Sequence, residues 1–147
     1  MAQRCKKVLL AEDNRVLLMA SKFALERAGY EVILATDGED AVRVARHTLP
    51  DLIILDMLMP KLSGNQVLRA LKQDPHTAGI PVIVISSLSQ RNEPKLLQDG
   101  AAAYYEKSNL GPETLGEIVA GMIGRPAAAR GSFTLDRIPT EIPEEMV

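Results

Sequence analysis

The sequence predicts an α/β fold in which helices cover both faces of a parallel β-sheet. Short apolar runs alternate about five times with longer amphipathic segments, as strands and helices do in such a sheet. The short runs are almost wholly apolar, which is expected of strands buried on both faces. With 147 residues, the chain is long enough for one domain with its own core.

The first half of the chain is expected to contain three strands and three helices. After the first apolar run, apolar residues recur at helical spacing between Asn14, which can cap a helix, and Gly29, which can close it. Asp37-Gly38 predicts a turn, and Pro60 and Gly64 mark a loop. The expected strands are residues 8–11, 32–35 and 52–55, the last running into Asp56, and the expected helices are residues 14–28, 39–46 and 66–72.

The second half continues the alternation. Pro81 opens a strand, and Pro94 is tolerated only in the first turn of the short helix that follows. Gly100 ends that helix, and Pro112 starts the last one, which Gly116 and Gly121 weaken. The expected strands are residues 82–85 and 102–105, and the expected helices are residues 95–98 and 112–122.

The composition changes after Gly124. Residues 125–147 contain three prolines and no convincing periodicity, so we expect a flexible tail or linker after a domain of residues 1–124. The alternative is that this segment docks on the folded domain through its apolar side chains, which are Phe133, Leu135, Ile138 and Ile142.

Composition argues against several classes of protein. The formal net charge is −2 and aromatic residues are scarce, which disfavours general nucleic-acid binding. The single cysteine, Cys5, permits no intrachain disulfide and fits a reducing compartment. The first apolar run is too short for a signal peptide or a membrane span. His47 and His76 are expected to be exposed at the surface, and Met57 is expected to pack in the core.

Chemistry-bearing residues follow four of the five predicted strands. Glu12 and Asp13 follow the first strand, Asp56 the third, Ser86 and Ser87 the fourth, and Lys107 the fifth. Ligands of doubly wound sheets bind beyond the carboxyl ends of the strands. Clustered carboxylates favour a divalent cation, and oxygen ligands without Cys or His suit Mg²⁺. With a lysine and a hydroxyl to contact phosphoryl oxygens, the set suits phosphoryl transfer.

From about Lys6 to about Met122, the chain resembles response-regulator receiver domains. The resemblance rests on VLLAEDN (8–14), PDLIILDMLMPKLSG (50–64), PVIVISS (81–87) and DGAAAYYEK (99–107). It implies a flavodoxin-like (βα)5 fold with strand order 2-1-3-4-5, for which a receiver protein is a standard example. It also implies a bacterial, cytoplasmic signalling protein rather than an enzyme acting on a separate substrate.

The resemblance further implies a role for each site residue. Asp56 is expected to accept a phosphoryl group from a kinase phosphohistidine. Asp13, Asp56 and the backbone carbonyl of Leu58 are expected to bind Mg²⁺, with Glu12 acting through water.

Four other positions match the family's phosphoryl-contacting and switch residues. Lys107 and Ser86 are expected to contact the phosphoryl oxygens, together with the backbone of Ser87. Ser86 and Tyr104 are expected to change position on activation. The expected partners are a sensor histidine kinase or phosphotransfer protein and an unidentified output protein, with the chain a monomer or a phosphorylation-dependent dimer. Neither nucleic acid nor a membrane is expected as a partner.

Two departures from the family pattern concern the loops. Ser108 stands where proline commonly follows the lysine, and the stretch from Ser86 to Gly100 is about one residue short. In receiver domains two positions flank the approach of a hydrolytic water, and the resemblance places Leu58 and Leu88 there. Neither side chain can hold a water by a hydrogen bond, which predicts a long-lived phosphorylated state. Alternatively, both leucines face solvent or a partner.

Three other functions compete with the signalling switch. A haloacid-dehalogenase-like phosphatase or mutase would need an acid two residues after the nucleophile, where this chain has Leu58. A receiver used only for protein interaction would not need the full acidic set and Lys107. A flavin-binding protein would need a phosphate cradle in its first loop, where Glu12 and Asp13 would repel the phosphate.

Overall fold

The computed structural model describes residues 6–86 and 97–125 of the chain. They form one five-stranded parallel sheet in the order β2-β1-β3-β4-β5. The strands are β1 (Lys7–Ala11), β2 (Glu31–Ala35), β3 (Leu52–Asp56), β4 (Val82–Ser86) and β5 (Ala103–Glu106). This confirms the predicted fold class and strand order.

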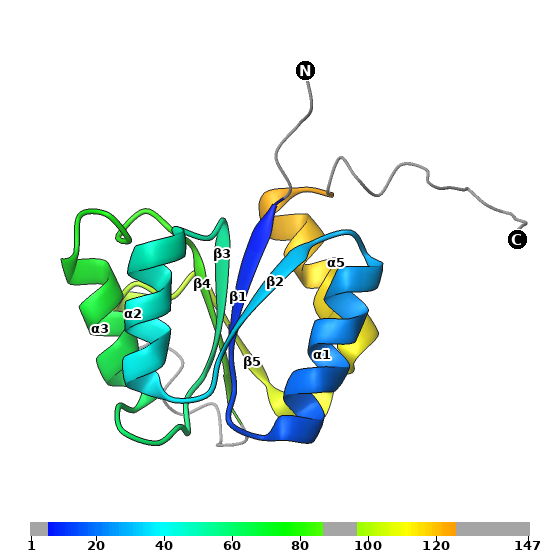
Figure 1. Cartoon of the computed structure of the whole chain (residues 1–147), viewed down its shortest axis with the longest axis horizontal. Helices are drawn as coiled ribbons and strands as arrows, with labels where there is room; N and C mark the ends of the chain where they lie inside the picture. The colour runs from blue at the N-terminus through cyan, green and yellow to red at the C-terminus, as the bar shows by residue number, and fades with distance from the viewer. Residues whose placement is uncertain (1–5, 87–96, 126–147) are drawn as a thin grey trace, which may run out of the picture.

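The helices form two layers, one on each face of the sheet. In Figure 1, α2 and α3 lie on the left of the sheet, and α1 and α5 lie on the right. Their bounds are α1 (Arg15–Arg27), α2 (Gly38–Thr48), α3 (Gly64–Gln73) and α5 (Pro112–Ile123), and one 3₁₀ turn, η2 (Lys107–Asn109), precedes α5. Within residues 6–86 and 97–125, no helix combines the length and apolar character needed to cross a bilayer.

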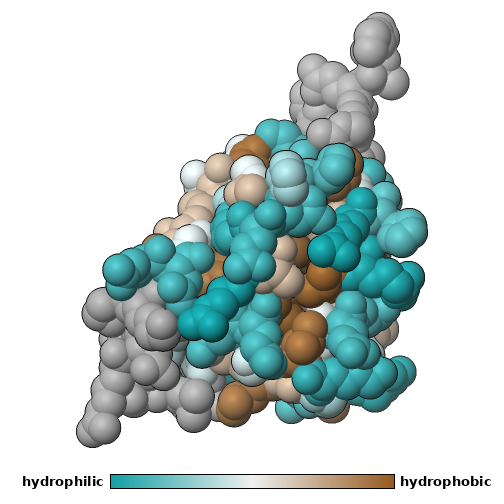
Figure 2. All heavy atoms as spheres, turned by 90° about the vertical axis from the view of Figure 1, so that its left-hand side faces the viewer, coloured by the Kyte–Doolittle hydropathy of each residue, from teal (hydrophilic) through white to brown (hydrophobic). Residues whose placement is uncertain are grey.

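Side chains alternate between the two faces of the sheet and make two separate hydrophobic clusters. Leu9, Ile53 and Val84 point to one face and pack with α2 and α3 residues such as Leu68. On the other face, Leu10 and Ile83 belong to a cluster completed by Leu18 and Leu25 of α1 and Leu115 and Val119 of α5. The outer surface over α2 and α3 is mostly hydrophilic, with only a narrow hydrophobic band (Figure 2).

Helix ends follow the local chemistry, with one correction to the sequence prediction. The Asn14 side chain accepts a hydrogen bond from the Leu17 N–H at the start of α1, and Gly29 follows that helix with φ 102°. The predicted turn at Asp37-Gly38 is wrong: Asp37 caps α2 by accepting from the Asp40 N–H at 2.8 Å, and Gly38 is the first helical residue. Asp is favoured both in turns and as a helix N-cap, so the Asp37-Gly38 dipeptide alone does not distinguish a turn from the start of a helix.

Other boundaries differ by one or two residues. β5 begins at Ala103 rather than residue 102, and α2 continues to Thr48, two residues past the prediction. Of the predicted helix at 95–98, Leu97 and Gln98 are helical, and the remainder, with Pro94, lies outside the described residues. His47 and His76 are exposed and Met57 is buried, as expected.

Candidate functional site

The carboxyl ends of the strands bring acidic residues and a lysine together at the lower end of the sheet in Figure 1. Glu12 and Asp13 directly follow β1, Asp56 is the last residue of β3, and Lys107 directly follows β5. Since β1 and β3 pair side by side, with Ala11 opposite Leu55, the acids that follow these two strands are neighbours. The topology therefore assembles a site from residues that lie as many as 95 positions apart in sequence.

Lys107 contacts two buried carboxylates at once. Its Nζ lies 2.9 Å from Asp56 Oδ2 and donates a hydrogen bond to it. It also donates to Glu12 Oε2 at 3.2 Å and forms an ion pair with Glu12 Oε1 at 3.0 Å. Both acidic side chains are only 1% exposed, whereas the Lys107 side chain is 22% exposed. One ammonium group thus bridges two carboxylates that are otherwise removed from water.

The cluster carries more negative than positive charge. Burial raises the pKa of Glu12, and the nearby charge of Asp56 raises it further. Hydrogen bonds from the Asn14 N–H and from Lys107 lower this pKa, but the net shift is upward. Burial alone would lower the pKa of Lys107, but its hydrogen bonds and charge interactions with Asp56 and Glu12 together raise it. The lysine is therefore held in its charged form by acids that it does not fully neutralise.

A third carboxylate, Asp13, completes a potential metal-binding cluster. One ligand oxygen from each of Glu12, Asp13 and Asp56 lies within 4.8 Å of the others. Asp13 is exposed, so this side of the cluster is open to water. Three hard oxygen donors with no sulfur or imidazole match the preference of Mg²⁺. The donor set and its unbalanced negative charge therefore fit a divalent cation.

The loop after Asp56 is fixed by close backbone packing. The Leu58 N–H donates to Asp56 Oδ1 at 3.2 Å, and the Gly64 N–H donates to the Met57 carbonyl at 3.0 Å. A Cβ on Gly64 would lie 2.7 Å from Met57 Cα, and one on Gly38 would lie 2.3 Å from the Leu62 carbonyl oxygen. Only glycine fits at these two positions, so the loop is held against the starts of α2 and α3.

The remaining predicted residues occupy different environments. Ser86 ends β4 and is fully buried, and Tyr104 on β5 is 7% exposed. Leu58 is 51% exposed. Ser87 and Leu88 lie outside the described residues. Ser108, which replaces the common proline, is exposed in the middle of the η2 turn.

Sequence reasoning did not find two features of the site. One is the contact of Lys107 with Glu12, because strand order places the two residues at one edge without indicating which groups touch. The other is the Asn14 backbone, whose N–H donates to Glu12 Oε2 at 3.0 Å. Asn14 was recognised from its side chain as a helix cap, and nothing in the sequence pointed to its N–H group.

Comparison with known proteins agrees with this arrangement. Residues 8–120 match the family model described as the response regulator receiver domain. The polar-differentiation response regulator DivK of Brucella anthropi is 35% identical over 103 residues, which cover 69% of this chain and 84% of that protein.

Two solved structures show the same fold. A CheY-like response regulator receiver domain protein from Methanospirillum hungatei JF-1 is 25% identical with a TM-score of 0.73, covering 82% of this chain and 94% of that one. The receiver domain of a sensor histidine kinase from Pseudomonas aeruginosa PAO1 is 30% identical with a TM-score of 0.73, covering 82% and 99%. That structure has a magnesium ion coordinated in its active-site cleft.

Proposed function

Because this chain belongs to the response regulator receiver domain family, we propose that it is a two-component signalling switch phosphorylated on Asp56. The observation that carries the proposal is the convergence of Glu12, Asp13 and Asp56 with Lys107 at one edge of the sheet. Glu12 and Asp56 lie close to Asp13 and are paired with Lys107. Together the four residues supply an acceptor, cation ligands and a balancing positive charge.

In the proposed reaction, a carboxylate oxygen of Asp56 attacks the phosphorus of a phosphohistidine on a sensor kinase or phosphotransfer protein. The new O–P bond forms as the N–P bond to the histidine breaks, and the imidazole leaves with the electron pair and takes up a proton. The Leu58 N–H and Lys107 hold the two carboxylate oxygens of Asp56 in fixed positions.

The carboxylates fit a resident Mg²⁺, which Asp13, Asp56 and the Leu58 carbonyl would hold, with Glu12 acting through water. When bound, the cation would supply charge neutralisation at the phosphoryl oxygens. The protein's own contribution is the burial of Glu12, which leaves a carboxylate with a raised pKa beside the ligands. The magnesium in the Pseudomonas receiver domain supports this assignment.

Lys107 and Ser86 are proposed to contact the new phosphoryl group. The Lys107 ammonium lies 2.9 Å from Asp56 Oδ2. Once Asp56 is phosphorylated, the ammonium could contact a phosphoryl oxygen in place of the carboxylate oxygen. Ser86 ends the strand next to β3, where Ile85 pairs with Asp56. A movement of Ser86, together with the buried Tyr104, which pairs with Val84 on the same strand as Ser86, would carry the change toward an output partner. The backbone of Ser87 would add a further donor.

The test is phosphorylation of the full chain with a small acyl-phosphate donor and Mg²⁺, followed by intact-mass spectrometry. We expect one phosphoryl group on the wild type and none on Asp56→Asn. Asp40→Asn is the matched control, since Asp40 lies on α2 and pairs with Arg43, and it should be phosphorylated like the wild type. An adduct retained on Asp56→Asn would assign the acceptor elsewhere. A wild type with no adduct would favour a receiver used only for protein interaction.

The domain boundaries are part of the same proposal. The receiver unit is placed at residues 1–124, with 125–147 as an appended segment that phosphorylation does not require. The cognate kinase or phosphotransfer protein docks on this unit, and the phosphorylated form binds the output protein. Equal phosphorylation rates with and without the appended segment would support this division.

A further inference from the structure

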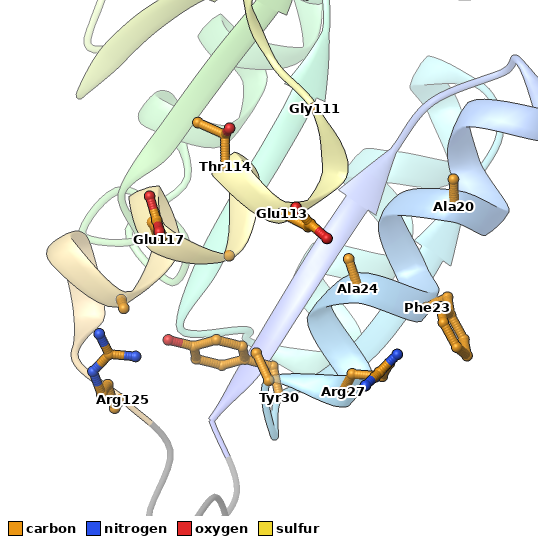
Figure 3. A pocket seen from close by; sticks show the side chains of 13 residues that line it. Ala20, Phe23, Ala24, Arg27, Tyr30, Gly111, Glu113, Thr114, Glu117 and Arg125 are labelled. Carbon is orange, nitrogen blue, oxygen red and sulfur yellow. The ribbon is translucent and has the colours of Figure 1, made fainter.

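A groove of about 640 Å³ runs between α1 and α5, on the side of the sheet away from α2 and α3 (Figure 3). Small residues line its two sides: Ala20, Ala24 and the C-cap residue Ala28 on the α1 side, and Gly116 and Ala120 on the α5 side. Even a Cβ on Gly116 would be no closer than 4.0 Å to its nearest neighbour, the Ala28 Cβ. Because these side chains are so short, packing of the two helices leaves a hollow large enough for several apolar side chains.

A large aromatic residue stands exposed on the rim of this groove. Phe23 is 61% exposed, and the Arg27 guanidinium lies 5.6 Å from its ring centroid. Phe23 and Arg27 lie side by side on α1 in Figure 3, with Ala24 facing α5. An exposed aromatic beside a hollow lined by small residues is the kind of surface that another segment covers.

The chain leaves α5 at the end of the same groove. The Tyr30 hydroxyl donates to the Gly124 carbonyl at 2.8 Å, and Lys6 Nζ donates to the Ile123 carbonyl. Gly124 has a φ of 84°, which turns the backbone out of the helix. Tyr30 and Arg125 both line the groove, at its lower end in Figure 3. Residues 126–147 therefore start from a fixed point on the groove itself.

We propose that residues 126–147 dock back into this groove in the same molecule, with Phe133 and Leu135 as the inserted side chains. Phe133 is eight positions after Arg125, a reach of roughly 26 Å in extended form. The stretch of α1 from Ala28 back to Ala20 is only about 12 Å long, so the chain has enough length to turn and run along it. In an extended segment Phe133 and Leu135 point to the same side, and both can enter the hollow together.

The connection to the groove is the reason to favour this segment over a separate partner. A segment tethered at the groove is present at an effective concentration in the millimolar range, without the cost of bringing two molecules together. Of the two interpretations that the sequence allowed for the C-terminal segment, the groove favours docking. The proposal does not rest on the phosphorylation chemistry proposed for Asp56.

The test uses the full chain, which contains no tryptophan. In Phe133→Trp the new side chain is the only indole, and its emission and its quenching by acrylamide report whether it is buried. Thr140→Trp is the matched probe at a polar position of the same segment, outside the two proposed inserted side chains. We expect a blue-shifted emission and a several-fold smaller quenching constant for Phe133→Trp than for Thr140→Trp.

Blocking the groove should release the probe. Gly116→Leu fills the hollow, whereas Gly121→Leu makes the same change at an exposed α5 position that does not line it. In the Phe133→Trp background, we expect Gly116→Leu to restore solvent-like emission and quenching, and Gly121→Leu to leave them unchanged. Leu135→Ser, which alters only the appended segment, should raise quenching without touching the folded domain.

Three results would overturn the proposal. They are a solvent-like signal from Phe133→Trp at the outset, a protected signal that Gly116→Leu and Leu135→Ser both leave intact, and protection that disappears on dilution. The last result would mean that the segment docks on a second copy of the chain.

Discussion

Replacing Lys107 with methionine should destabilise the domain more than the loss of any exposed ion pair. The change keeps most of the aliphatic stem and removes the ammonium group that contacts the two buried carboxylates of Glu12 and Asp56. Taking one partner from a fully buried ion pair costs about 3–5 kcal/mol. Because the Lys107 side chain is 22% exposed, water can enter the gap, and we expect the lower figure of about 2–3 kcal/mol near neutral pH.

The loss should depend on pH in a definite direction. The pKa of Glu12 is already raised by burial from its ordinary value of 4.5, so the folded state binds this proton more tightly than the unfolded state. The free energy of unfolding therefore falls as pH rises from that ordinary value through the folded-state pKa. Without the Lys107 ammonium the pKa of Glu12 rises further, so the penalty should be largest near pH 7 and smaller near pH 5.

The assay is urea unfolding followed by circular dichroism, in the presence of a chelator, near pH 7 and near pH 5. Lys22→Met is the matched control: Lys22 pairs with Glu26 at 3.0 Å, but that carboxylate is 43% exposed. We expect the control to lose no more than about 0.5 kcal/mol, as exposed helix pairs do. A Lys107→Met loss no larger than the control's, or one that does not shrink on acidification, would refute the reasoning.

Further predictions concern the metal, the adduct and the core. Mg²⁺ at about 100 times its Kd should stabilise the fold by about 2.7 kcal/mol, seen as a higher Tm, and Asp13→Asn should remove most of that shift; equal shifts in both proteins would place the metal elsewhere. After donor removal, Leu58→Asn and Leu88→Glu should each lose the Asp56 adduct faster than the wild type by mass spectrometry, and unchanged or slower decay in both would reject the role given to the leucines. Leu68→Ala, at a fully buried position, should cost about 2–5 kcal/mol in urea unfolding, and a loss below about 1 kcal/mol would mean that α3 repacks around the change.

The order of the elements was predictable because burial dictates it locally. A strand such as β3, with the sequence LIILD and all five residues buried, must be apolar on both faces, and that pattern is visible without a structure. Glycine and proline likewise mark where helices stop, as Gly29 and Gly100 do with their positive φ angles. The exact helix starts were less predictable, since Asp37 serves equally well in a turn or as a cap.

The sequence was enough to predict which residues form the site, but not which of their atoms touch. Parallel topology requires Glu12, Asp56 and Lys107 to meet at one edge, whatever their separation in sequence. Which oxygen the Lys107 ammonium contacts depends on side-chain rotamers and on the η2 turn, and neither leaves a pattern in the sequence. The groove between α1 and α5 is similar: its alanines and glycines are ordinary helix residues until two helices place them face to face.

The division of the core into two clusters has a consequence for how this domain can change over generations. The cluster beneath α2 and α3 and the cluster beneath α1 and α5 share the backbone of the strands but no side chains. A substitution that enlarges a residue in one cluster can be compensated by shrinking a neighbour in that cluster, without disturbing the opposite layer. Each helical face can therefore acquire new binding specificity by a separate series of mutations, while the sheet keeps the carboxylates at its edge in register.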